Sequence, residues 1–184
     1  MIFYEKSPRN ITLNEAKKLI DTSKELRIIP VGVFVDHEIN DLKKIISSLG
    51  LSYVQLHGSE DQLYINEIKR QFDVKIIKKI SINNSEDISI INKFKNIEYL
   101  LFDYKPIKNE LPGGNSKSFD WNLLKGQQIK LPWFISGGIN ENNIKKIQNL
   151  LNPNGIDLSS GVEVSKGIKS NSKINNLFKK FYDN

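Results

Sequence analysis

Short apolar runs rich in β-branched residues alternate along the chain with longer stretches whose apolar residues recur at helical spacing. The apolar runs predict seven strands, over residues 2–4, 28–35, 53–56, 74–80, 98–102, 133–135 and 156–158. The stretches that follow them predict seven helices, over residues 14–23, 36–49, 61–72, 85–93, 120–124, 140–151 and 172–181. Such regular alternation is typical of an α/β fold built on a parallel sheet.

Two architectures fit this pattern, a doubly wound open sheet and a (β/α)8 barrel. A complete barrel typically needs about 250 residues, and this chain has 184. The length therefore favours the open sheet, whereas the motifs described below favour a barrel of the phosphate-binding kind. In either architecture we expect one domain that spans residues 1–184.

In parallel α/β folds the active site lies at the carboxyl ends of the strands, so the residues after each strand are the candidates for chemistry. The last two predicted strands run into small-residue loops, Ser-Gly-Gly at 136–138 and Ser-Ser-Gly at 159–161. Glycine lets a ligand approach the backbone, and amide groups at the start of a helix favour an anion. Two such loops on consecutive strands predict a phosphate site, although tight entry into a helix would explain either loop alone.

Three further polar residues lie at or just after predicted strand ends. Asp103 follows the fifth predicted strand, where a carboxylate serves either as a general acid or base or as a helix cap. His57 suits acid–base chemistry, a substrate contact or a structural hydrogen bond. Arg9 either clamps a carboxylate through two hydrogen bonds or simply lies in solvent. The long polar loop over 105–118 is either a lid over a site or an ordinary surface loop.

Composition narrows the classes of partner. The 27 Lys and Arg residues outnumber the 21 Asp and Glu residues and give a net charge of +6, but only three of the 27 are arginines. A solvated lysine-rich surface explains this charge better than a nucleic-acid interface, because no aromatic and basic platform is present. The absence of cysteine excludes disulfides and thiolate metal sites within these residues. Without an apolar membrane span or a signal-peptide pattern, we expect a cytoplasmic protein with no membrane partner.

Seven stretches of the sequence carry a resemblance to a known family. They are FYEKSPR at 3–9, VGVFVD at 31–36, VQLHG at 54–58, LFD at 101–103, GGNSKSFDW at 113–121, ISGGI at 135–139 and IDLSSGVE at 156–163. Each stretch alone is a weak signal, but their combination in this order is specific and covers the chain from its first residues. In these stretches the sequence resembles phosphoribosylanthranilate isomerase, a phosphate-binding (β/α)8 barrel enzyme of tryptophan biosynthesis.

The resemblance implies an Amadori rearrangement that converts N-(5′-phosphoribosyl)anthranilate to 1-(2-carboxyphenylamino)-1-deoxyribulose 5-phosphate. Asp103 matches the family's general acid, which protonates the ribose ring oxygen and opens the ring to an imine. Arg9 matches the arginine that holds the anthranilate carboxylate. The remaining expected contacts are His57, Gly114 and Asp157 with the substrate, and Gly137, Gly138, Ser159, Ser160 and Gly161 with its phosphate. No cofactor or metal is expected, because one acid and one base move the protons.

The sequence departs from the family at the general base. In the family this base is a cysteine in a KICG motif at the end of the first strand, and the present sequence has no cysteine. Met1 is expected to align within the second strand, so that roughly 20–25 residues of a full barrel are missing and about seven βα units remain. A start site placed too late, or a shortened chain, is the favoured explanation. A repurposed barrel and a first strand supplied by another chain are the alternatives.

Two other functions stay open beside the isomerase. One is a non-catalytic or repurposed phosphate-binding barrel, and the other is an isomerase of a related aminated sugar phosphate. The expected ligand is in every case a phosphorylated small molecule rather than nucleic acid. A second copy of the chain, or a fused or neighbouring tryptophan-pathway enzyme, is the expected protein partner.

Overall fold

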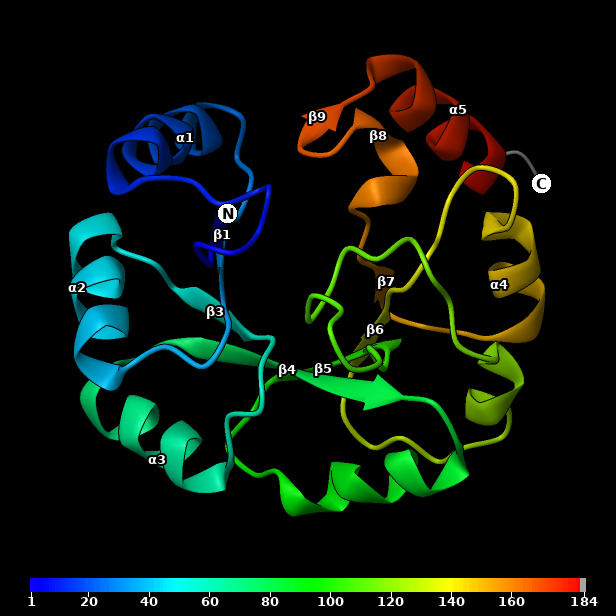
Figure 1. Cartoon of the computed structure of the whole chain (residues 1–184), viewed down its shortest axis with the longest axis horizontal. Coiled ribbons are helices and arrows are strands. Elements are labelled where there is room, and N and C mark those ends of the chain that lie inside the picture. Colours follow the sequence, from blue (N-terminus) through cyan, green and yellow to red (C-terminus); the bar gives the residue numbers. More distant parts are fainter. Residues whose placement is uncertain (183–184) are drawn as a thin grey trace. The chain divides into compact units, whose positions relative to one another are not determined.

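The protein is described by a computed structural model over residues 1–182. These residues form two compact units (Figure 1). The first unit comprises Met1–Lys79 and Asn92–Glu98, and the second comprises Ile80–Ile91 and the chain from Tyr99 onward. Strand β4 (Lys75–Ile82) runs from the first unit into the second.

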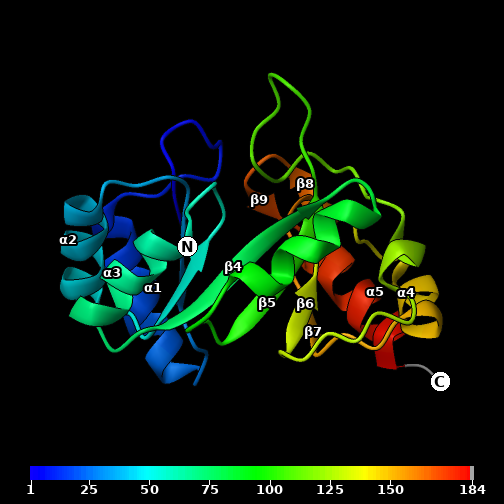
Figure 2. The ribbon, with the colours of Figure 1, turned by 90° about the horizontal axis from the view of Figure 1, so that it is seen from below.

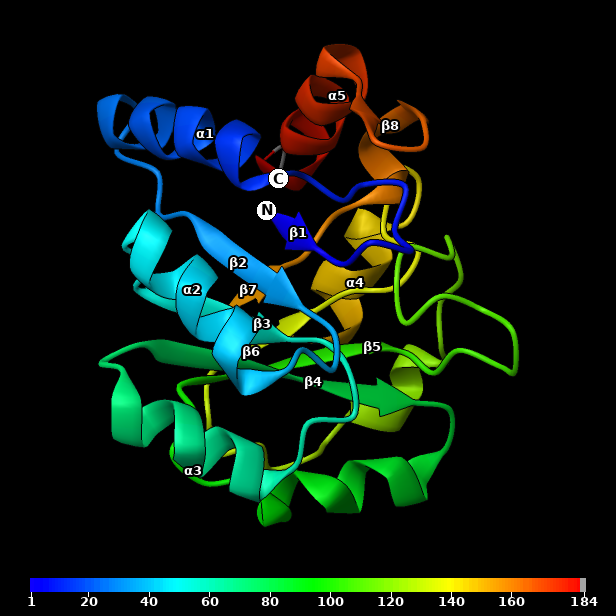
Figure 3. The ribbon, with the colours of Figure 1, turned by 60° about the vertical axis from the view of Figure 1, so that its left-hand side comes forward.

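The first unit repeats a strand followed by a helix. Its elements are β1 (Ile2–Phe3), α1 (Leu13–Glu25), β2 (Val31–Phe34), α2 (Ile39–Leu49), β3 (Tyr53–Leu56), α3 (Gln62–Gln71) and the start of β4. Neighbouring strands are parallel and follow chain order, with Val31 opposite Tyr53 and Tyr53 opposite Lys75. Figure 3 shows β1 beside β2, and Figures 1 and 2 show the three helices gathered on one side of the strands.

This arrangement bears on the choice between the two architectures. A doubly wound sheet reverses its strand order and carries helices on both faces, whereas a barrel keeps its strands in chain order with the helices outside. In the first unit the order is sequential and the helices share one face, as in a segment of barrel wall. The helices bury their apolar stripes, including Ile20 of α1, Leu42 and Ile46 of α2 and Ile65 of α3.

The second unit continues the same pattern. After β4 come η1 (Ser85–Lys93), β5 (Tyr99–Tyr104), η2 (Trp121–Leu124), β6 (Trp133–Ile135), α4 (Ile144–Leu150), β7 (Gly155–Ile156), η3 (Ser160–Val162), the hairpin β8 (Glu163–Ser165) and β9 (Ile168–Lys169), and α5 (Asn171–Tyr182). Strands β5, β6 and β7 are parallel and adjacent in chain order, with Leu100 opposite Trp133 and Phe134 opposite Gly155.

The predicted strand and helix pattern is largely confirmed over residues 1–182. Strands β1 to β7 lie at the seven predicted positions, and β3 and β6 have the predicted bounds. Strand β2 is shorter than predicted and begins at Val31, because Pro30 has no N–H to donate to a sheet and the two isoleucines before it remain about 60% exposed. The segments after β4 and β5 are 3-10 rather than α-helices, and the β8–β9 hairpin was not predicted.

Two shifted boundaries change the setting of acidic residues. Strand β5 extends to Tyr104, so Asp103 lies within the strand rather than after it. Helix α2 was predicted to start at residue 36 but starts at Ile39. Asp36 instead has a left-handed backbone (φ 48°), and its carboxylate accepts hydrogen bonds from the N–H (2.7 Å) and hydroxyl (2.8 Å) of Ser59. Asp36 therefore joins the loop after β2 to the loop after β3.

A buried ion pair between Lys78, within β4, and Glu60 reinforces the loops after β2 and β3. Lys78 Nζ lies 2.8 Å from Glu60 Oε2, and the two side chains are 3% and 1% exposed. The Glu60 carboxylate also accepts the backbone N–H groups of Asp36 (2.9 Å) and Gly58 (3.0 Å). Lys78 donates a further hydrogen bond to the Gly58 carbonyl (3.0 Å). Each buried charge is thus paired and hydrogen-bonded, as burial of charge requires.

Replacing Lys78 with methionine is expected to lower the free energy of unfolding by about 3 kcal/mol, because Glu60 would keep its buried charge without a counterion. Urea unfolding measures the change. Lys44→Met is the matched control, since Lys44 and Asp41 form a 2.8 Å pair whose side chains are 73% and 60% exposed. Breaking that surface pair should cost less than about 1 kcal/mol. Equal losses in the two variants would contradict a special role for the buried pair.

Candidate active site

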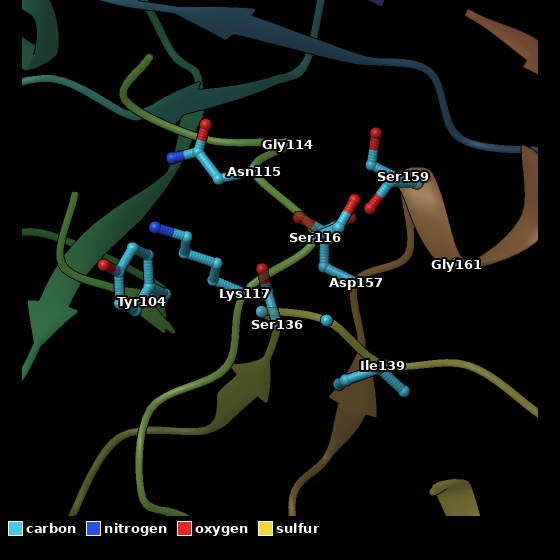
Figure 4. Close-up of a pocket in the computed structure, with 13 residues that line it drawn as sticks. Tyr104, Gly114, Asn115, Ser116, Lys117, Ser136, Ile139, Asp157, Ser159 and Gly161 are labelled. Atoms are coloured by element: carbon cyan, nitrogen blue, oxygen red, sulfur yellow. The ribbon is translucent and has the colours of Figure 1, made fainter. Parts of the chain in front are cut away.

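The second unit contains a pocket at the carboxyl ends of its parallel strands. Its walls are three chain segments: the end of β5 with the loop that follows it, the loop after β6, and the loop after β7. The lining residues are Tyr104, Gly114, Asn115, Ser116, Lys117, Ser136, Gly137, Gly138, Ile139, Asp157, Ser159, Ser160 and Gly161. Figure 4 shows Asn115 and Lys117 on one side of the pocket and Ser159 and Gly161 on the other.

Asp103 lies beside this pocket. It belongs to β5, is only 5% exposed, and its Oδ1 accepts the N–H of Tyr104 at 2.8 Å. A Cβ atom on Gly137 would lie 3.1 Å from the same Oδ1. The carboxylate therefore directly faces the glycine loop after β6, where a side chain would crowd it.

The glycines let the three walls meet backbone to backbone. Gly137 (φ 90°) and Gly138 (φ 66°) have left-handed conformations that favour glycine. A Cβ on Gly138 would lie 3.2 Å from the carbonyl carbon of Lys117, and one on Gly161 would lie 1.8 Å from the carbonyl oxygen of Ile139. Any larger residue at these positions would push the walls apart.

The loops were predicted to bind an anion partly through helix starts, and this part of the prediction needs correction. Helix α4 starts only at Ile144, because residues 140–143 first form a turn held by their own asparagine side chains. The helical segment after Ser159 is η3, which has three residues and so a small dipole. Anion binding at these loops therefore has to rest on individual backbone N–H groups and hydroxyls.

Charge in the lining comes from one cation and one carboxylate, Lys117 and Asp157. Lys117 forms an ion pair with Glu110 in the same loop, and its Nζ lies 5.8 Å from the centre of the Tyr104 ring. The hydrogen bond with Glu110 raises the pKa of Lys117, and the same bond lowers the pKa of Glu110. The wall therefore carries an ion pair at this point rather than an isolated positive charge.

The other two predicted site residues lie in the first unit. Arg9 is half-buried in the turn after β1, where its backbone N–H donates a hydrogen bond to Ser7 Oγ at 3.1 Å. His57 is buried after β3, and its backbone N–H donates a hydrogen bond to the Phe34 carbonyl at 2.8 Å. Its Nδ1 lies 3.1 Å from Gln55 Oε1.

The structure thus groups the predicted residues of the second unit as expected. Gly114, Asp157 and all five expected phosphate contacts line one pocket, and Asp103 adjoins it. Tyr104 and Lys117 line the pocket but were not among the predicted site residues, although the long polar loop that carries Lys117 was singled out. No group of three His, Asp or Glu side chains suited to a metal ion occurs in residues 1–182. In the same part of the chain no helix is long and apolar enough to cross a membrane.

Comparison with known proteins gives a consistent answer across nearly the full chain. The sequence model of the family described as N-(5′-phosphoribosyl)anthranilate (PRA) isomerase matches residues 1–180. The N-(5′-phosphoribosyl)anthranilate isomerase of Zymomonas mobilis is 41% identical over 175 residues, which cover 94% of this chain and 82% of that protein. The Paramagnetospirillum magneticum isomerase is 33% identical over 181 residues, which cover 97% of this chain and 84% of that protein.

Solved structures agree. Phosphoribosylanthranilate isomerase from Thermotoga maritima superposes with a TM-score of 0.84 at 28% identity, covering 98% of this chain and 85% of that chain. A phosphoribosylanthranilate isomerase solved with reduced 1-(o-carboxyphenylamino)-1-deoxyribulose 5-phosphate gives 0.81 at 27% identity, covering 98% of this chain and 84% of that chain. These similarities confirm the α/β barrel-type fold over the open sheet. The chain therefore belongs to the N-(5′-phosphoribosyl)anthranilate isomerase family.

Proposed function

We propose that this chain acts as one domain on N-(5′-phosphoribosyl)anthranilate and isomerises it to 1-(2-carboxyphenylamino)-1-deoxyribulose 5-phosphate. The observation that carries the proposal is the placement of Asp103 against the glycine-lined pocket of the second unit, in a member of this family. A general acid next to an anion cradle is what a phosphorylated sugar needs when its ring is opened by protonation.

Asp103 supplies the proton that opens the ring. Protonation of the ribose ring oxygen lets the bond between that oxygen and the anomeric carbon break, with the anthranilate nitrogen forming an imine. The buried position of Asp103 keeps water away from the acid, and the lack of a side chain at Gly137 leaves its carboxylate uncrowded. Positioned acids of this type typically contribute about 10²–10⁴-fold to the rate.

The pocket holds the phosphate end of the substrate. Ser136, Ser159 and Ser160 bring hydroxyl groups to its lining, and the glycines leave backbone N–H groups uncovered by side chains. In line with this, a relative was solved with a phosphorylated product analogue.

The remaining contacts follow from the family match. Arg9 holds the anthranilate carboxylate, and His57, Gly114 and Asp157 contact the rest of the substrate. We propose the cytoplasm as the site of action and a second copy of the chain as partner, since one relative from Thermotoga maritima is described as dimeric.

One observation favours a second function, which is ligand binding without turnover. After ring opening a base must take the proton from the sugar carbon next to the imine, and the family resemblance gives this role to a cysteine. The 184 residues contain none. Assays of the acid are therefore best run both on the chain as it stands and on the chain extended at its amino end by a relative's strand and helix with that cysteine.

Asp103→Asn is expected to lower kcat by about 10²–10⁴-fold with little change in KM, because the amide keeps the shape of the side chain but has no acidic proton. Turnover of the substrate under steady-state conditions measures both constants. The control is Asp120→Asn, which changes an exposed helix cap to another good cap. Full activity of Asp103→Asn in a chain whose parent is active would disprove the general-acid role.

Arg9→Met is expected to raise KM by about 10–100-fold, since a charge-assisted hydrogen-bonded pair with a carboxylate is worth about 1.5–3 kcal/mol. Binding of inorganic phosphate should be unchanged, because that ligand has no carboxylate. Lys6→Met, at an exposed position of the same turn, serves as the charge-matched control. A KM for Arg9→Met equal to that of the control would remove Arg9 from the site.

Gly161→Ala is expected to weaken the binding of inorganic phosphate by about tenfold or more, because the new methyl group overlaps the Ile139 carbonyl and separates the two loops. Isothermal titration calorimetry gives the dissociation constant. In the control Gly126→Ala nothing lies within 4 Å of the added Cβ, although Gly126, unlike Gly161, has a positive φ (74°). Phosphate affinity equal to that of the unmodified chain in Gly161→Ala would contradict the placement of the phosphate.

A further inference from the structure

Two carbonyl groups of the phosphate loops are held by side chains that do not line the pocket. The Gly138 carbonyl accepts hydrogen bonds from Asn140 Nδ2 (3.1 Å) and Asn143 Nδ2 (2.9 Å). The Ser159 carbonyl accepts one from Lys169 Nζ (2.9 Å) and a longer one from the Val162 N–H (3.4 Å). Both glycine-rich loops thus have one peptide anchored through its oxygen.

Anchoring the oxygen also fixes the next N–H group. A peptide unit is planar and trans, so its carbonyl and the N–H of the following residue point in opposite directions. The Ile139 N–H must therefore point away from Asn140 and Asn143, and the Ser160 N–H away from Lys169. Ile139 and Ser160 are both residues of the pocket lining.

The anchors are themselves firmly held. Asn143 Oδ1 accepts the Asn140 N–H (2.9 Å) and Asn140 Oδ1 accepts the Asn142 N–H (2.8 Å), so each amide group uses its oxygen on the turn and its nitrogen on Gly138. Lys169 pairs with Glu163 at 2.9 Å, and the Glu163 side chain is buried. These side chains therefore have little freedom to release the carbonyls.

Such holding matters most at the Gly138–Ile139 peptide, because Gly138 is a glycine with a positive φ, whereas the Ser159–Ser160 peptide has a serine on each side. A glycine peptide turns over readily because the residue has no Cβ, and a turned peptide would aim its carbonyl oxygen instead of its N–H at the ligand. An oxygen with partial negative charge repels a phosphate, whereas an N–H attracts it. The orientation of two peptides thus decides whether the loops favour or disfavour the anion.

We infer that Asn140, Asn143 and Lys169 are positioning residues for the phosphate, acting from outside the pocket by turning the N–H groups of Ile139 and Ser160 toward it. The inference rests on the proposed phosphate site. It assigns to these residues no contact with the ligand. Their effect is on affinity for the phosphate end of the substrate, not on the proton transfer at Asp103.

The test compares dissociation constants for inorganic phosphate, measured by calorimetry on the full chain. Lys169→Met and the double variant Asn140→Ala/Asn143→Ala are each expected to bind about tenfold more weakly. The asparagine variant changes no charge, so its loss separates peptide orientation from simple electrostatics. Lys169→Arg keeps a cationic donor and should bind within about threefold of the unmodified chain. In the turnover assay the same variants should raise KM and leave kcat nearly unchanged.

Matched controls lie beside each anchor. Lys166→Met removes a cation from the same hairpin and Asn142→Ala removes an exposed amide from the same turn, and both should bind phosphate normally. Thermal melting checks that every variant is folded, and if one anchor variant unfolds the other still decides. Binding by both anchor variants at the level of their controls would overturn the inference while leaving the phosphate site intact. Failure of the unmodified chain to bind phosphate would instead overturn the proposed site and the inference with it.

Discussion

Parallel pairing in chain order is the constraint on which the functional part of this molecule depends. Because β5, β6 and β7 are adjacent and parallel, the segments that leave them emerge at one edge, although they come from positions about 30 and 20 residues apart in the sequence. Asp103, Gly137 and Asp157 all lie at that edge, and strand pairing alone is enough to bring them there. Parallel pairing in chain order also brings Asp36, Gly58 and Lys78 together in the first unit. There the buried ion pair of Lys78 and Glu60 joins β4 to the loops after β2 and β3.

Most of the fold was predictable because its strands are apolar and its helices amphipathic, and both are properties of local sequence. The errors arise where one residue overrides the pattern. Strand β2 starts only after Pro30, because proline has no N–H to donate to the sheet. Asp36 lies outside the helix predicted to include it, because its carboxylate accepts a hydrogen bond from the loop after β3. The hairpin around Lys166 and Gly167 was missed because its strands are too short and polar for an alternating pattern.

The site was predictable only in part, because some of its residues stand out from the surrounding sequence and others do not. Pairs of glycines and serines after apolar strands stand out, so the two loops that line the pocket were singled out from the sequence. Asn140, Asn143 and Lys169 do not stand out, because asparagine and lysine are abundant throughout this chain and only the folded structure shows which ones reach a carbonyl. Lys78 was hidden for a similar reason, since a lysine within a strand does not reveal that it will be buried against Glu60. The roles proposed for Arg9 and Asp103 come only from the family resemblance.

The contact between Gly161 and the Ile139 carbonyl has a consequence for how such a pocket changes over evolutionary time. At Gly161, where the two walls touch through their backbones, there is no side chain to exchange, so substitution at this position has few viable outcomes. The third wall is a long loop that bears ordinary side chains such as Asn115 and Lys117, and surface loops tolerate changes of length. New substrate preferences in relatives of this chain should therefore accumulate in the loop after β5, while the phosphate end of the pocket stays the same.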